Sequence, residues 1–113
     1  MSIQLLTDRE RTVVKGAKEI INVEARWTRG CEARNEKGEP CKWYDCHGVS
    51  YCGSAALRSA AVDQLDVGFC VATRVCHDIE IKLYDFAGCW LDDLNDDAGR
   101  DYVIELFDDA LAV

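Results

Sequence analysis

Apolar residues recur at intervals of three or four in several separate stretches of this chain, a spacing typical of amphipathic α-helices. The first stretch follows Thr7 and Glu10, whose separation matches the capping box at a helix N-terminus. Its apolar positions are Val13, Val14, Ala17, Ile20 and Ile21. We therefore expect a first helix over residues 7–25.

A second stretch combines leucine with small residues. Its apolar positions are Ala55, Ala56, Leu57, Ala60, Ala61 and Leu65. Because small side chains let another helix approach closely, we predict that this helix lies at the centre of the fold.

A third stretch predicts a helix over residues 69–85. Its apolar positions are Val71, Val75, Ile79, Leu83 and Phe86. Residues 79–84 also alternate between apolar and polar side chains, as in a β-strand. The sequence leaves helix and strand open for these residues.

The last part of the chain predicts an acidic turn over residues 91–97, followed by a final helix. Asp101 has the chemistry of an N-cap for that helix. Its buried face is expected to hold Val103, Leu106, Phe107 and Ala110.

The helical pattern is absent from residues 27–51, which we call the excursion. Glycines and Pro40 interrupt it, and residues 35–38 indicate a turn between two short extended arms. A chain of 113 residues that is 49% hydrophobic can bury one core. We therefore expect a mainly α fold: one domain of residues 1–113, with three to five helices around a core and one irregular or hairpin excursion.

Charge is distributed unevenly along the chain. Residues 60–113 carry 13 acidic and three basic side chains, whereas residues 1–59 carry eight acidic and ten basic ones. The net charge is −8, the sum of −10 in residues 60–113 and +2 in residues 1–59. Such a half repels nucleic acid and anionic membranes and attracts a basic protein surface.

The N-terminal segment, Met1 to Val14, carries charges at Asp8, Arg9, Glu10 and Arg11, where an export signal needs an apolar run. No later run reaches membrane-spanning length. We expect a soluble, cytoplasmic protein. Its seven cysteines are odd in number, and in a reducing compartment we expect free thiols that pack as small apolar groups.

Three motifs keep an order that resembles a family of small bacterial and phage proteins known only as a domain of unknown function. They are Trp27-Thr28, the helix start Tyr51-Cys52-Gly53-Ser54-Ala55-Ala56-Leu57, and Asn95-Asp96-Asp97-Ala98-Gly99-Arg100. The chain departs from the family pattern at Ser54-Ala55, where Gly-Ala is usual, and in the additional Cys31, Cys41 and Cys46. The resemblance implies a fold and a setting among bacteria and mobile elements, and it implies no catalytic residue.

The excursion also contains residues with the chemistry of zinc ligands. They are Cys31, Cys41, Cys46, His47 and Cys52. Their spacing supplies only one half of the usual zinc-knuckle pattern, so we expect packing thiols, no metal ligand and no cofactor. A zinc-stabilised structural domain remains the alternative.

A cysteine-dependent enzyme is a third hypothesis, because Cys46-His47 and Cys76-His77 pair a thiol with an imidazole. Neighbouring residues diverge on a helix and on a strand, so we expect neither pair to form a dyad. The sequence has no phosphate loop or nucleophile elbow. We therefore predict no enzymatic activity and no catalytic residue.

Aromatic residues in the excursion, with arginines and lysines among them, allow a stacking platform for single-stranded nucleic acid as an alternative. The aromatic residues are Trp27, Trp43, Tyr44 and Tyr51, with Trp90 outside the excursion. Because the net charge is −8, we favour a structural role for them and expect no direct contact with nucleic acid.

Seven aspartates lie between residues 92 and 109, more than capping or solubility requires. Excluding Asp101 as a cap, the expected partner-binding residues are Asp92, Asp93, Asp96, Asp97, Asp108 and Asp109. The leading hypothesis is a small acidic binding protein that acts on a basic surface of a nucleic-acid machine. It would be a phage or mobile-element inhibitor of the anti-CRISPR or anti-restriction kind.

Overall fold

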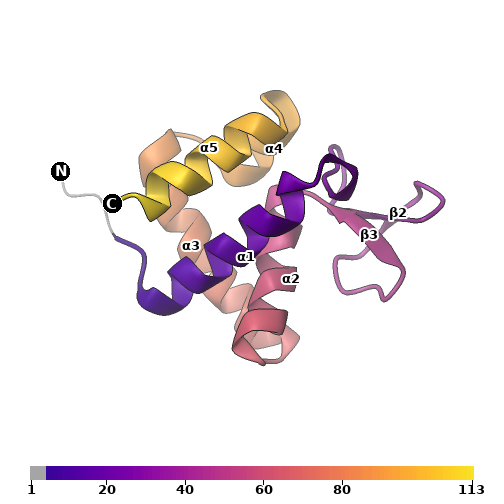
Figure 1. The fold of residues 1–113 in the computed structure, drawn as a ribbon, viewed down its shortest axis with the longest axis horizontal. Helices are drawn as coiled ribbons and strands as arrows, with labels where there is room; N and C mark the ends of the chain where they lie inside the picture. Colours follow the sequence, from indigo (N-terminus) through magenta and orange to yellow (C-terminus); the bar gives the residue numbers. More distant parts are fainter. Residues whose placement is uncertain (1–4) are drawn as a thin grey trace.

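The computed structural model describes residues 5–113 of the chain. Residues 1–4, at the start of the segment considered above for an export signal, lie outside the described residues. The elements are α1 (Asp8–Asn22), the 3₁₀-helix η1 (Glu24–Arg26), β1 (Ala33–Asn35), β2 (Pro40–Cys41), β3 (Gly48–Tyr51), α2 (Gly53–Leu65), α3 (Phe69–Ala87), α4 (Leu91–Asp97) and α5 (Arg100–Leu111). Most of these residues are helical, which confirms the predicted mainly α fold. Figure 1 shows the small sheet to one side of the packed helices.

The capping box predicted for α1 is present. The backbone N–H of Thr7 donates to the Glu10 carboxylate at 2.8 Å, and the backbone N–H of Glu10 donates to the Thr7 hydroxyl at 3.2 Å. The helix ends at Asn22, earlier than predicted, because Val23 has an extended backbone and η1 then turns the chain.

Helix α2 is central, as its small side chains predicted. It contacts α1, α3, α4 and β3. A Cβ atom added at Gly16 of α1 would lie 3.1 Å from the Cβ of Ala60, so the two helices meet at close range. This approach depends on small residues on both helices.

Helix α3 settles the choice between helix and strand for residues 79–84. Ile79 and Leu83, four residues apart, are both fully buried, whereas Ile81 is exposed. The apolar and polar alternation therefore does not reflect a sheet. Burial of every third or fourth residue decides the conformation.

Two predictions near the C-terminus were wrong. Residues 91–97 form α4, because Leu91 and Asn95, one helical turn apart, both bury their side chains. Helix α5 starts at Arg100 after Gly99, whose φ of +104° reverses the chain, so Asp101 lies inside the first turn and is not the N-cap. Its charge still lies near the positive end of the helix dipole.

The excursion forms an antiparallel sheet in the order β2-β1-β3. The predicted turn at residues 35–38 joins its first two strands, with the Gly38 N–H donating to the Asn35 carbonyl at 2.9 Å and Gly38 at φ +77°. Among the described residues, no helix has the length and apolar character needed to cross a membrane.

Candidate functional site

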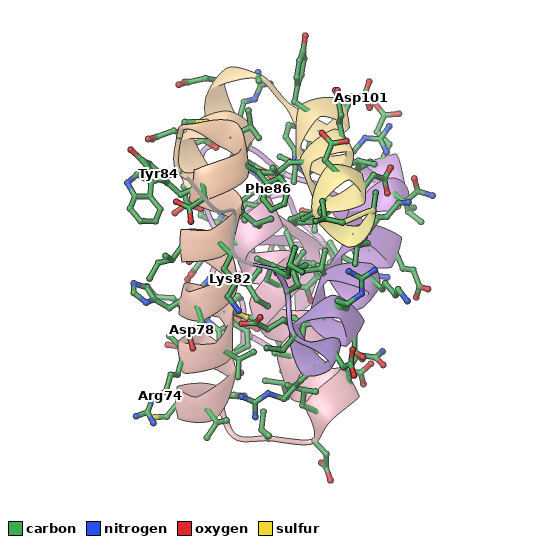
Figure 2. The ribbon with its side chains drawn as sticks, turned by 90° about the vertical axis from the view of Figure 1, so that its left-hand side faces the viewer. Arg74, Asp78, Lys82, Tyr84, Phe86 and Asp101 are labelled. Carbon is green, nitrogen blue, oxygen red and sulfur yellow. The ribbon has the colours of Figure 1, made fainter. Side chains whose placement is uncertain are left out.

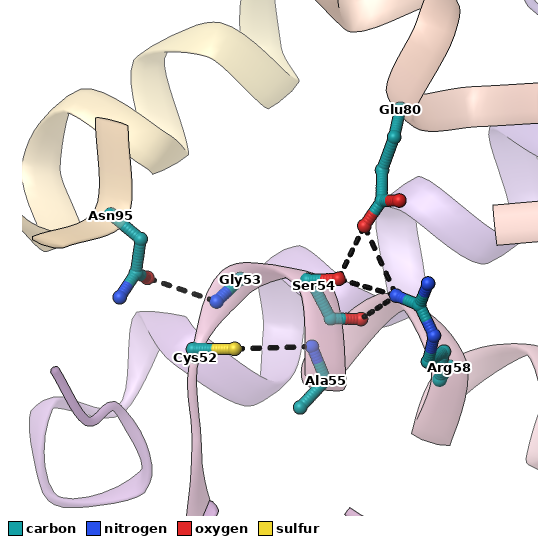
Figure 3. A network of polar contacts seen from close by, with 7 residues as sticks. All are labelled: Cys52, Gly53, Ser54, Ala55, Arg58, Glu80 and Asn95. Atoms are coloured by element: carbon teal, nitrogen blue, oxygen red, sulfur yellow. Dashed lines mark hydrogen bonds and ion pairs between the residues drawn. The ribbon is translucent and has the colours of Figure 1, made fainter. Parts of the chain in front are cut away.

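A buried asparagine holds α4 against the rest of the fold. Asn95 is completely buried, and its side-chain oxygen accepts the Trp27 indole N–H at 2.8 Å and the Gly53 backbone N–H at 2.9 Å. Its amide group donates to the Thr28 carbonyl at 3.1 Å. Figure 3 shows Asn95 reaching the first residue of α2. The acidic helix is thereby fixed against α2 and the start of the excursion.

A second polar network joins α2 to α3 beside this contact (Figure 3). Arg58 donates to Glu80 at 3.0 Å and to the Ser54 carbonyl at 3.1 Å, and the Ser54 hydroxyl also bonds to both side chains. The side chains of Arg58 and Glu80 are mostly buried. The polar atoms of these three side chains bond to one another, so the network braces α2 against α3.

A depression of about 210 Å³ lies where α4 meets the excursion. It is lined by Gly30, Cys31, Glu32, Cys52, Asp92 and Asp96. We call it the acidic depression, because three of its six residues carry carboxylates. The Gly30 N–H donates to Asp96 at 3.1 Å and holds the two walls together.

The electrostatics of the acidic depression disfavour further negative charge. The pKa of Asp92 is raised above its usual 3.8, first because its carboxylate is partly removed from water and next because Glu80 lies nearby. Asp96 and Asp93 add to the increase, and Arg58 opposes it. A cation in the depression would relieve this repulsion.

The structure divides the six predicted partner-binding aspartates between two places. Asp92, Asp93, Asp96 and Asp97 are all exposed on α4. Asp108 and Asp109 are exposed on α5, where Asp108 forms an ion pair with Lys18 of α1. The charge of Asp108 is therefore balanced within the fold, and the four aspartates of α4 are the stronger candidates.

The cysteines differ in exposure: some are buried, some are partly buried and two are exposed. Burial raises the pKa of Cys52 to about 11 and that of Cys76 to about 12, so both remain protonated near neutral pH. These two are packing thiols, as predicted. The prediction was wrong for Cys46 and Cys70, which are exposed because they lie in a surface loop and at the outer start of α3.

The five proposed zinc ligands do not gather at one point. The Cys52 thiol accepts the Ala55 N–H at 3.4 Å as the N-cap of α2, and the Cys31 thiol donates to the Ala33 carbonyl at 3.4 Å. Among the described residues, only Cys46 and His47 come close enough to share an ion, together with Asp45. Asp45 was missed because single aspartates are common, although the tripeptide Asp45-Cys46-His47 is visible in the sequence.

The aromatic side chains connect the excursion to the helices. Trp43 and Tyr44 lie against Phe69 of α3, with ring centroids 5.1 and 5.3 Å apart. Trp90 packs against Tyr84 at 4.7 Å. The two clusters are made by different segments, and the described residues do not form one stacking row.

Glu32 and Asn95 were also absent from the predicted site. Glu32 lies in the basic half of the chain, and only the fold brings it to the same depression as Asp92. Asn95 lies among exposed aspartates, so the local sequence gives no indication that its side chain is buried.

Comparisons with protein-family models, with curated proteins and with solved structures find no match to this chain. The resemblance suggested by the three motifs therefore stays a hypothesis.

Proposed function

We propose that this chain is a small, non-enzymatic, cytoplasmic binding module that docks α4 on a basic surface of a partner protein. The observation that carries the proposal is the exposure of four aspartates without an ion-pair partner among the described residues: Asp92, Asp93, Asp96 and Asp97. All four are exposed, and no lysine or arginine of the described part of the chain forms an ion pair with them. Their charge remains available to a partner.

The shape of the site favours a partner with protruding basic side chains. The acidic depression is concave, and Glu32, Asp92 and Asp96 line it from two segments. A lysine or arginine side chain entering it meets carboxylates on two sides, and arginine can bind a carboxylate with two parallel hydrogen bonds. A neighbouring positive charge would favour the ionised form of Asp92, whose pKa is raised by burial and by nearby carboxylates.

The concrete form of the proposal is an inhibitor that occupies the nucleic-acid-binding groove of a host protein. Duplex DNA presents about one negative charge per 1.7 Å of its axis. Four aspartates on a seven-residue helix offer a similarly dense anionic row. The origin in a phage or mobile element rests on the family resemblance alone.

Of the two other hypotheses, cysteine catalysis is disfavoured at Cys52 and Cys76. Both thiols are buried, and the pKa of each is raised, whereas a catalytic thiolate requires a lowered pKa. Zinc binding, the other hypothesis, would involve a different region of the surface from α4.

The proposal is tested by capturing partners from a lysate of the source organism and measuring binding of the purified partner. Changing Asp92, Asp93, Asp96 and Asp97 together to Asn is expected to weaken binding about tenfold or more. Because Asn retains a hydrogen-bond acceptor at position 96, the contact to Gly30 can persist. The melting temperature shows whether the fold is intact.

The matched control changes four exposed aspartates elsewhere to Asn, with the same change in net charge. These are Asp63, Asp66, Asp78 and Asp85, none of which belongs to the predicted partner-binding set. Because separated surface charges are screened beyond about 10 Å at 0.1 M salt, the control should bind almost as well as the parent. Binding that survives both the α4 change and high salt would refute the proposal and direct attention to Trp43 and Tyr44.

A further inference from the structure

The loop between β2 and β3 is folded by hydrogen bonds around Asp45. The Asp45 N–H donates to the Lys42 carbonyl at 3.0 Å, and the Gly48 N–H donates to the Asp45 carbonyl at 3.0 Å. The His47 N–H donates to one oxygen of the Asp45 side chain at 2.8 Å. These bonds turn the chain twice within a few residues, so neighbouring side chains need not diverge as they do on a helix or strand.

This loop brings three different ligand groups together. A carboxylate oxygen of Asp45, the thiol sulfur of Cys46 and a ring nitrogen of His47 all lie within 4.8 Å of one another. The three residues are exposed. The expectation that adjacent cysteine and histidine point apart was therefore wrong for Cys46 and His47.

The chain contains an internal comparison. Cys76-His77-Asp78 has the same three residue types in a row, but it lies within α3, where successive side chains are about 100° apart around the axis. Cys76 is completely buried, and His77 and Asp78 are exposed. Figure 2 shows Asp78 on the outer side of α3. The loop conformation, and not the composition, creates the cluster at residues 45–47.

We infer that Asp45, Cys46 and His47 form a binding site for a divalent transition metal ion, with zinc as the best fit. Thiolate, imidazole and carboxylate are the three zinc ligands of proteins, with bonds of about 2.0 to 2.3 Å. Tetrahedral bonds of that length place ligand atoms about 3.3 to 3.8 Å apart. Exposed side chains can close the remaining distance by rotation.

The atoms of the site suffice for coordination. One oxygen of Asp45 accepts the His47 N–H, which leaves the other free for the metal. The ion takes the place of the Cys46 thiol proton, which passes to solvent. Three protein ligands leave a fourth position for water, the arrangement of an open zinc site.

The surroundings of the loop favour a cation and restrict its motion. Asp45 and His47 line a hollow of about 300 Å³ together with Glu36, Lys37 and Glu39. Its acidic side chains outnumber its one lysine, so the hollow favours a cation. Next to the ligands, Trp43 and Tyr44 pack on Phe69 of α3. This packing attaches the loop to the helices, so the loop loses less conformational freedom when an ion binds.

A nucleophilic cysteine at this place is the weaker interpretation. Among the described residues, no hydrogen bond joins the Cys46 thiol to the His47 ring, and both side chains are exposed to water. An activated thiolate needs a base within hydrogen-bond reach. A metal ion needs only that the three side chains converge.

The experiment is a titration of the reduced full chain with Co²⁺, followed by displacement with Zn²⁺. Bound Co²⁺ reports a thiolate ligand through a sulfur-to-metal charge-transfer band in the near ultraviolet. We expect one ion per chain, the charge-transfer band, and loss of the band when Zn²⁺ is added. The variants are C46S, H47A and D45N, the last of which can keep the bond to the His47 N–H.

Each ligand variant should lower the affinity for Co²⁺ about tenfold or more. Even a mutation of a residue that only hydrogen-bonds to a metal ligand typically lowers metal affinity about 10- to 100-fold. C46S should also abolish the charge-transfer band. Because all three side chains are exposed, the metal-free variants should melt with the parent. The matched controls are C70S, another exposed cysteine, and H77A, the only other histidine; both should bind as the parent does.

Two results would overturn the inference. One is a parent protein that gives no charge-transfer band with Co²⁺. The other is a band that persists in C46S and disappears when Cys31 or Cys41 is changed to Ser, which would place the ion elsewhere in the excursion. Neither result bears on the four aspartates of α4, so the proposed function is tested separately.

Discussion

The indole N–H of Trp27 donates to the side-chain oxygen of Asn95 at 2.8 Å, joining residues 68 positions apart in the sequence. The same oxygen accepts the N–H of Gly53, and the amide group of Asn95 donates to the Thr28 carbonyl. One buried side chain thus connects α4, the first residue of α2 and the start of the excursion. The position of the acidic depression depends on this connection.

Asn95→Ala should destabilise the protein by about 3 kcal/mol. The change leaves the Trp27 indole, the Gly53 N–H and the Thr28 carbonyl without a partner, and each unsatisfied buried group costs about 1 to 3 kcal/mol. Urea unfolding of both proteins measures the difference. Asn22→Ala, at an exposed asparagine, serves as the control and should stay within about 0.5 kcal/mol of the parent. Equal stability of the two variants would mean that Asn95 does not hold α4 against α2 and the excursion.

Phe107→Ala should cost about 3 to 5 kcal/mol, because it removes a completely buried ring from the core face of α5 and leaves a cavity. Tyr102 offers a matched control on the same helix, since it is 58% exposed. Tyr102→Ala should change the free energy of unfolding by about 0.5 kcal/mol or less. If both variants melt together, α5 does not pack on the core through Phe107.

Glu10 makes part of the stability depend on pH. Burial alone would raise its pKa, but the hydrogen bond from Lys82 at 2.5 Å and that from the Thr7 backbone hold the pKa below its usual 4.5. Figure 2 shows Lys82 pointing from α3 into the bundle. Since the folded-state pKa is lowered, this contribution is present above pH 4.5 and is lost as the pH falls through the folded-state value.

Glu10→Gln should therefore be less stable than the parent at neutral pH by about 3 kcal/mol, because it leaves Lys82 mostly buried without its charge partner. The difference should shrink as the pH is lowered below 4.5, as measured by urea unfolding at a series of pH values. Glu19→Gln, at an exposed position of α1, should follow the parent at every pH. A difference that does not change with pH would contradict the role assigned to the ion pair.

Local patterns were the reliable part of the sequence. The capping box at Thr7 and Glu10 and the turn ending at Gly38 involve residues within three or four positions, so their geometry follows from the adjacent chain. The helices α1 and α3 are long, so the spacing of their apolar residues repeats over several turns and is visible in the sequence. Helix α4 is only seven residues long, too short for a period to be visible, and it was predicted as a turn.

The sequence by itself determined the mainly α fold, the turn at residues 35–38 and the acidity of the C-terminal half, because each follows from side-chain spacing, local turn residues or net charge. Whether the excursion is irregular or a hairpin stayed open until the structure. Only the tertiary structure decided that Asn95 is buried, that Lys18 balances Asp108 and that Glu32 and Asp92 line one depression. These relations join segments far apart in the chain, and their energies arise from burial and proximity that no local pattern encodes. The loop at residues 45–47 follows the same rule, since the same three residue types at positions 76–78 are held apart by a helix.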